Sequence, residues 1–160
     1  MIPFPVSRLS RIDLAQAAAL ILLTTLLASP FARAQQSERF GPYELHYSVV
    51  NSTFIAPAVA AEYGITRGSR RAFVNLALRE HLPDGSTVAR AMDIDGRSWD
   101  LTEQNVNFDF IEVREGPALY YIGEFKFINR EWRYFEFAFT PEGSEERYTY
   151  KFKRQLYIND

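Results

Sequence analysis

The segment Tyr134–Phe139, YFEFAF, places a phenylalanine at every second position, at Phe135, Phe137 and Phe139. In an extended strand, successive side chains point to opposite faces, so these three rings share one face. Three large apolar side chains on one face indicate that this face packs against a core. The segment therefore predicts a half-buried β-strand, and a period of two is the pattern with which the rest of the chain is compared.

The same alternation recurs along most of the chain after residue 35. It predicts strands over 43–49, 72–78, 88–94, 99–101, 106–110, 119–127, 134–139 and 148–158. The connections between these strands are short and contain turn residues, for which we expect hairpin turns at 83–86, at Asp95-Gly96 and at 141–143. Parallel strands need longer crossover connections, so the pattern favours antiparallel pairing.

These short strands and tight turns predict an all-β fold, an antiparallel two-sheet sandwich of immunoglobulin-like architecture. An open antiparallel barrel is the alternative that the same pattern allows. One segment, 57–63 (PAVAAEY), is typical of a helix instead. Proline stands in its first turn and Gly64 follows at its end, and both are common at those helix positions. We therefore expect one short helix near residues 57–63.

The start of the chain has the composition of a secretory signal peptide. Residues 1–34 contain a basic start with Arg8 and Arg11, an apolar run of 15 residues at 14–28, and Ala32-Arg33-Ala34 as a cleavage site. An apolar run of 15 is shorter than the ~20 residues that a membrane-spanning helix needs. We predict that residues 1–34 are removed, that Gln35 is the mature N-terminus, and that the protein is periplasmic without a membrane span. An uncleaved membrane anchor is the alternative.

Residues 35–160 are long enough for a single β-sandwich domain with one core. They contain 11 Phe, 9 Tyr and 2 Trp, which supply a large apolar area for that core. The chain has no cysteine, which excludes disulfides, a thiolate zinc site and a cysteine nucleophile. This part carries 15 basic and 19 acidic residues, a net charge of −4. It has no basic excess to follow a phosphate backbone, so nucleic acid is not expected as a partner.

One polar row has residue types that occur in hydrolases. Glu44, His46 and Ser48 are two residues apart, so a strand places all three on one face. A serine, a histidine and a carboxylate can form a catalytic triad, but a triad also needs an oxyanion hole, which the sequence does not show. A solvated polar face explains the same spacing. We therefore assign no catalytic residue and keep a hydrolase that uses this row as the alternative function.

The sequence also offers little for a metal ion or other cofactor. Asp93, Asp95 and Gly96 are similar to the start of a calcium loop, but an EF-hand has its glycine at position 6, and Gly96 would stand at position 4. His46 and His81 have no cysteine to complete a metal site. We therefore predict no metal site and no cofactor.

Two further groups of side chains are explained without a binding site. A small basic cluster follows the expected helix, at Arg67, Arg70 and Arg71, and is more typical of a solvated loop than of an anion site. Most aromatic residues fall on faces that the alternation assigns to the core. The side is ambiguous for Trp132, Tyr120 and Tyr134, which could belong to a sugar-stacking platform or a peptide groove.

Several short motifs lie between Gly41 and Leu76. They are Gly41-Pro42-Tyr43-Glu44, His46-Tyr47-Ser48, Asn51-Ser52-Thr53-Phe54, Pro57, Val59-Ala60, Tyr63-Gly64-Ile65 and Ala72-Phe73-Val74-Asn75-Leu76. The chain resembles, over 38–160, the exported bacterial proteins that share domain of unknown function 4426. The resemblance implies a small periplasmic domain with no assigned activity, substrate or catalytic residue.

We therefore predict a non-enzymatic binding or accessory module that contacts an unknown protein or small ligand in the cell envelope. The run Asn51-Ser52-Thr53 leaves a strand and approaches the helix, where polar side chains satisfy backbone groups. That structural role is one interpretation of the run. The functional alternative is a polar rim of a shallow ligand or partner site, formed by Tyr47, Asn51 and Asn75.

Overall fold

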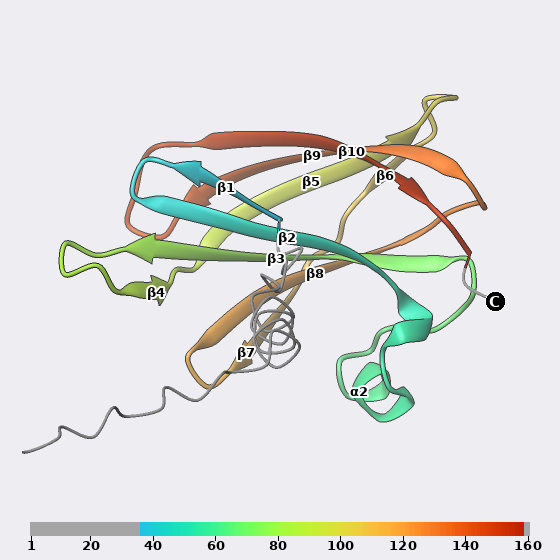
Figure 1. The fold of residues 1–160 in the computed structure, drawn as a ribbon, viewed down its shortest axis with the longest axis horizontal. Helices are drawn as coiled ribbons and strands as arrows, with labels where there is room; N and C mark the ends of the chain where they lie inside the picture. Colours follow the sequence, from blue (N-terminus) through green and yellow to red (C-terminus); the bar gives the residue numbers. More distant parts are fainter. Residues whose placement is uncertain (1–35, 159–160) are drawn as a thin grey trace, which may run out of the picture. The chain divides into compact units, whose positions relative to one another are not determined.

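Two antiparallel sheets pack face to face in the computed structural model, which describes residues 36–158 (Figure 1). The first sheet has the order β1-β2-β3-β8-β7, with β4 paired to β3, and consists of β1 (Gln36–Phe40), β2 (Tyr43–Asn51), β3 (Arg71–His81), β4 (Thr87–Ala89), β7 (Ile111–Glu115) and β8 (Ala118–Lys126). The second has the order β10-β9-β5-β6 and consists of β5 (Met92–Asp100), β6 (Asn105–Asn107), β9 (Glu131–Pro141) and β10 (Tyr148–Leu156). The predicted all-β sandwich is confirmed.

The predicted helix is present as α2 (Pro57–Glu62), which follows a short 3₁₀ turn, η1 (Ser52–Phe54). A proline starts α2, and Gly64 follows it with a left-handed φ of 68°. A helix this short is held by packing more than by propensity. Ala60 of α2 belongs to a small buried cluster with Phe73 and Ile122, which come from β3 and β8. The helix therefore covers part of the outer face of the first sheet.

The alternating phenylalanines of β9 form the centre of the core, as predicted. Phe135, Phe137 and Phe139 are all 0% exposed. Their neighbours are aromatic too, since the Phe135 ring stacks on Phe152 of β10 with 4.7 Å between ring centroids. The ring of Phe125 from β8 of the first sheet also packs on Phe135, with 5.5 Å between centroids, so rings from both sheets form the core without any disulfide.

The prediction of a hairpin at Asp95-Gly96 is wrong. Both residues lie inside β5, where Gly96 stands opposite Phe137 of β9. A Cβ atom on Gly96 would lie 2.7 Å from Cδ1 of Phe137 and 3.0 Å from Cε2 of Phe110. Glycine is needed here because two rings occupy the space of a side chain. The Asp-Gly pair is a local turn signal, and rings distant in sequence override it.

Two predicted strands are interrupted where the chain crosses from one sheet to the other. In the segment 88–94, β4 pairs with β3 in the first sheet, and the chain then crosses to the second sheet as β5. In the segment 106–110, β6 ends at Asn107, and the chain returns to the first sheet as β7. Phe108 stays buried between them. The apolar alternation runs through both crossings, so the period alone did not show the change of sheet.

The predicted signal peptide comprises residues 1–34, which lie outside the described residues. The described strands belong to one compact unit, Gln35–Asp160. Within residues 36–158, no helix has the length and apolar character that would let it cross a membrane.

Candidate functional site

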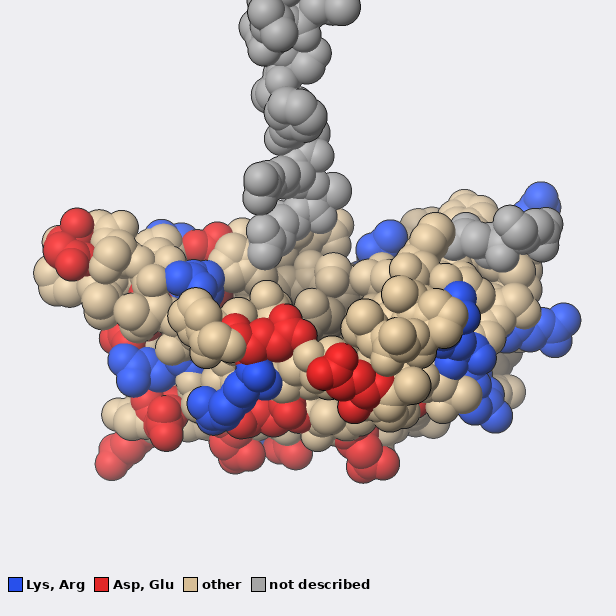
Figure 2. Space-filling model, turned by 90° about the horizontal axis from the view of Figure 1, so that it is seen from below, with Lys and Arg blue, Asp and Glu red and all other residues tan. Residues whose placement is uncertain are grey.

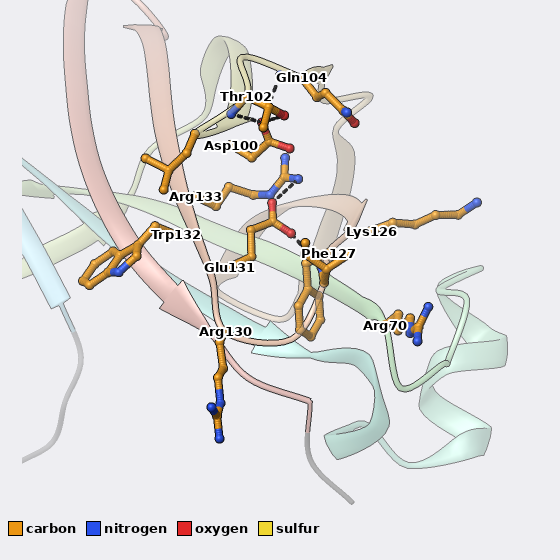
Figure 3. Close-up of a pocket in the computed structure, with 12 residues that line it drawn as sticks. Arg70, Asp100, Thr102, Gln104, Lys126, Phe127, Arg130, Glu131, Trp132 and Arg133 are labelled. Atoms are coloured by element: carbon orange, nitrogen blue, oxygen red, sulfur yellow. Dashed lines mark hydrogen bonds and ion pairs between the residues drawn. The ribbon is translucent and has the colours of Figure 1, made fainter.

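A cavity of about 620 Å³ opens at the end of the sandwich where the β5–β6 and β8–β9 loops meet (Figure 3). We call it the end cavity. Its apolar lining consists of Leu101, Phe127, Ile128 and Trp132. Its exposed cations are Arg70, Lys126 and Arg130. The cavity thus combines a largely apolar wall with a cationic rim.

The β5–β6 loop is held by one carboxylate. Oδ1 of Asp100 accepts hydrogen bonds from the backbone N–H of Thr102 at 2.8 Å, the Thr102 hydroxyl at 2.7 Å and the backbone N–H of Gln104 at 3.1 Å. The hydrogen bond from the Thr102 hydroxyl is the main cause that lowers the pKa of Asp100. Asp100 is therefore ionised at neutral pH and fixes this side of the cavity.

The β8–β9 loop is held by Glu131 in a similar way. Oε2 of Glu131 accepts a hydrogen bond from the backbone N–H of Ile128 at 2.6 Å, and Arg130 takes a left-handed φ of 63° to complete the turn. In Figure 3, Arg70 and Lys126 lie on one side of Glu131 and Trp132 on the other. Both loops are therefore preformed.

The buried part of the cavity contains an ion pair. Nη2 of Arg133 lies 2.5 Å from Oε1 of Glu131, and each side chain is 6% exposed. Nη1 of Arg133 donates to the hydroxyl of Ser98 at 3.1 Å, and the guanidinium lies 5.5 Å from the ring centroid of Phe125. Nε of Arg133 is buried and has no hydrogen-bond partner among residues 36–158. One buried donor at this site is thus left unused.

The free charge of the end cavity is positive. Asp100 and Glu131 hold the two loops, and Glu131 also neutralises Arg133. The three rim cations form no ion pair with any other residue of the described range. A concave, weakly polar surface with one sign of free charge attracts the opposite charge, so the end cavity favours an anion.

The predicted polar row lies on one face of β2, but its contacts are not those of a triad. Nε2 of His81 lies 2.7 Å from Oε2 of Glu44, and Nε2 of His46 lies 3.8 Å from Oε1 of Glu44. Hydrogen bonds from Ser37, first, and from His81 lower the pKa of Glu44. In the described part of the chain, no hydrogen bond joins His46 to Ser48. The register of β2 on β3 brings in His81, which spacing along one strand did not show.

The structure does not bring the three predicted rim residues together. Tyr47 faces the core, where its hydroxyl bonds the Tyr150 hydroxyl at 2.5 Å. Asn75 lies on the opposite face of the first sheet, beside His46, and lines a small cavity of about 50 Å³ to which Tyr47 also contributes. Asn51 donates from Nδ2 to the backbone carbonyl of Tyr157 at 2.7 Å.

The structural role predicted for the Asn51-Ser52-Thr53 run is observed in a modified form. Ser52 is fully buried, and its hydroxyl accepts from the N–H of Gly68 at 2.9 Å and donates to the carbonyl of Gly68 at 3.2 Å. Asn51 makes no capping bond to the turn that follows it. These side chains therefore satisfy backbone groups of distant segments, and not those of their own helix start.

The family model for a domain of unknown function, DUF4426, matches residues 37–159. The chain belongs to the DUF4426 family. The resemblance seen in the sequence is thus confirmed over almost the same residues. The crystal structure of a DUF4426 family protein from Pseudomonas aeruginosa PAO1 is 28% identical in sequence, with a TM-score of 0.68. The match covers 81% of this chain and 100% of that chain.

The DUF4426 fold is also similar to that of FetP from uropathogenic Escherichia coli. A copper-bound FetP variant is 8% identical, has a TM-score of 0.56, and matches over 79% of this chain and 97% of that chain. FetP expressed in the periplasm of E. coli is 8% identical with a TM-score of 0.55, over 79% and 96% of the two chains. At this identity the likeness shows the fold alone. No curated protein matches the chain.

A copper-bound neighbour raises the question of metal ligands in this DUF4426 domain. Within residues 36–158, no group of three or more histidine, aspartate or glutamate side chains is placed to hold a metal ion. Arg39 approaches His81 to 3.3 Å and adds a positive charge beside Glu44. Asp95 is paired to Arg147 at 2.6 Å. The carboxylates that the sequence offered for a calcium loop thus face an arginine.

The aromatic residues of ambiguous side now have places in the DUF4426 domain. Trp132 lines the end cavity, Tyr134 stacks on Trp99 with 5.6 Å between ring centroids, and Tyr120 packs beside the cluster under α2. The remaining residues of the end cavity were not predicted. The sequence contained one signal of this cavity. Glu131 and Arg133 lie on the same face of β9 as Phe135, so the alternation places two opposite charges on the core side of the strand.

Proposed function

We propose that this DUF4426 protein is an exported, non-enzymatic binding module whose end cavity holds a small amphiphilic anion. The ligand class is a molecule with an apolar body and a carboxylate or phosphate group. The observation that carries the proposal is the end cavity itself, where an apolar wall adjoins three cations that have no carboxylate partner in the described structure. A volume of about 620 Å³ is in the range of small-molecule sites.

The apolar wall supports an apolar ligand body. Leu101 and Ile128 are more than half exposed, and Trp132 is also exposed. Large apolar side chains left in water around a concavity are typical of a binding site, because the ligand removes them from water. The loops that carry them are already fixed by Asp100 and Glu131, so binding requires little ordering of the protein.

The chemistry of the cavity favours binding over catalysis. Its carboxylates are Asp100, which holds a turn, and Glu131, which holds a turn and pairs with Arg133. Neither is free to act as a general base. The hydrolase alternative at Glu44, His46 and Ser48 would need His46 to accept a proton from Ser48, and no bond between these two is described. The proposal therefore places function at the loops and not on β2.

Dodecyl phosphate should bind the unit Gln35–Asp160 and change the fluorescence of Trp132. Charge-assisted hydrogen bonds contribute about 1.5–3 kcal/mol each, so replacing one contacting cation should weaken binding about tenfold or more. The test variant is Arg70→Gln/Arg130→Gln, measured by fluorescence titration in the Trp99→Phe background. The matched control, Arg114→Gln/Arg147→Gln, removes two cations from paired sites elsewhere and should bind like the parent. Equal affinity of the test and control variants for dodecyl phosphate would reject the proposal. Equal affinity of the parent for dodecanol and for dodecyl phosphate would reject it as well.

Export should leave a protein that begins at Gln35. The composition of residues 1–34 supports this, and a structural neighbour, FetP, was expressed in the periplasm. Mass analysis of the intact protein from a periplasmic extract measures its N-terminus. Recovery of the chain from the inner membrane with residues 1–34 still attached would contradict export as a free protein.

A further inference from the structure

The most exposed apolar side chains gather at one end of the sandwich. Within residues 36–158, four large apolar side chains are more than half exposed: Phe54 (70%), Leu101 (69%), Ile128 (64%) and Tyr157 (51%). They come from η1, the β5–β6 loop, the β8–β9 loop and the segment after β10, all of which lie toward the right-hand end of Figure 1. Hydrogen bonds from Asn51 to Tyr157 and from Ile158 to Asn129 join these segments.

Unpaired cations surround these apolar tips. Arg70, Lys126 and Arg130 rim the end cavity, Arg67 donates to the carbonyl of Thr53, and Arg154 lines a groove with Phe54 and Tyr157. None of these five cations has an ion-pair partner among residues 36–158, whereas Arg90, Arg97 and Arg147 elsewhere are paired. Four further cations of the described residues also form no ion pair: Arg39, Arg71, Arg79 and Lys153. Figure 2 shows lysine and arginine without acidic side chains at the right-hand end, and acidic and basic side chains mixed over the rest of that face.

We propose that these four apolar and five cationic side chains, the end patch, dock the domain on an anionic lipid surface. Apolar tips enter the boundary between headgroups and acyl chains, and the cations contact the headgroup phosphates. The docking goes beyond the proposed function, because it needs no ligand in the end cavity.

The arrangement fits a lipid surface better than a protein partner. The apolar side chains stand on four separate segments with cations between them, whereas a stable protein interface has a continuous apolar centre. The remainder of the molecule is negative overall, since residues 35–160 carry a net charge of −4. An anionic membrane would therefore attract this end more strongly than the rest of the molecule, which favours one orientation of docking. In that orientation the end cavity opens toward the lipid.

Vesicle sedimentation tests the docking with the unit Gln35–Asp160, which contains every described strand and both buried clusters. We expect binding to vesicles of phosphatidylcholine with phosphatidylglycerol, weak binding to phosphatidylcholine alone, and loss of binding as salt is raised. Phe54→Ser/Tyr157→Ser and Arg67→Gln/Arg154→Gln should each weaken binding about tenfold or more. All four residues lie outside the lining of the end cavity.

Two control variants match these changes at other places. Val88→Ser removes an exposed apolar side chain of β4, and Arg114→Gln/Arg147→Gln removes the same net charge from paired sites. Both should bind vesicles like the parent. Equal loss in the control and end-patch variants, or equal binding to both vesicle types, would overturn the proposal. Absence of vesicle binding would overturn it as well. If the parent protein instead associates with itself, and Phe54→Ser/Tyr157→Ser abolishes that association, the end patch is a protein contact.

The same variants keep the two proposals separate. Phe54→Ser/Tyr157→Ser should retain the dodecyl phosphate affinity of the parent in solution, because neither residue lines the end cavity. Loss of vesicle binding with retained ligand affinity supports docking by the end patch. Normal vesicle binding of Phe54→Ser/Tyr157→Ser contradicts docking, whatever the end cavity binds.

Discussion

Phe137→Ala should lower the free energy of unfolding by about 3–5 kcal/mol, the usual cost of removing a buried phenylalanine ring. Phe137 is 0% exposed, and its ring lies among Phe108 at 5.9 Å and Phe152 at 6.0 Å between centroids. On the opposite strand Gly96 leaves space for this ring, so its loss opens a cavity that no neighbouring side chain fills. The denaturant midpoint of the unit Gln35–Asp160 measures the effect.

The neighbouring residue on the opposite face is the matched control. Glu136 lies between Arg97 at 3.2 Å and Lys151 at 2.8 Å, and the hydrogen bonds from Lys151, first, and Arg97 lower its pKa. Such exposed pairs contribute about 1 kcal/mol or less, so Glu136→Ala should move the midpoint only slightly. Equal midpoint shifts for Phe137→Ala and Glu136→Ala would mean that the two faces of β9 do not differ in burial.

The strands were predictable because a strand with one buried face has apolar residues at every second position of the sequence. The phenylalanines of β9 and the apolar side chains of β3 follow that rule, and both strands are where we expected them. The alternation does not indicate to which of the two sheets a strand belongs. Phe108 is buried at a crossing between sheets, and Gly96 is a glycine because of rings from other segments. Features that depend on residues far apart in sequence were therefore missed.

The end cavity belongs to this second kind of feature. Its lining comes from three separate segments, and only Trp132 was noted in the sequence as a residue of uncertain side. Arg70 was assigned to a solvated loop, and it is indeed exposed, but its position beside Lys126 follows from the register of β3 on β8. Opposite charges on the core face of β9, at Glu131 and Arg133, were the one local sign of a polar cavity at this end.

Glu131→Gln should be as destabilising as the loss of a core ring, by about 3–5 kcal/mol, because it leaves the buried guanidinium of Arg133 without its counter-charge. The amide that replaces the carboxylate would keep an oxygen for the N–H of Ile128, so the turn itself should survive. Chemical denaturation at neutral pH measures the loss. The reference is the double variant Glu131→Met/Arg133→Met, in which no buried charge remains.

The double variant should be more stable than Glu131→Gln, although it loses the acceptor for the N–H of Ile128, a cost of about 1–3 kcal/mol. Replacing both partners of a buried ion pair by apolar groups is often neutral, whereas breaking the pair is not. A loss below about 1 kcal/mol for Glu131→Gln would show that water reaches Arg133 and screens its charge. Water would then fill the end cavity as far as Arg133. Nε of Arg133 would donate to that water and would not be free to donate to a ligand.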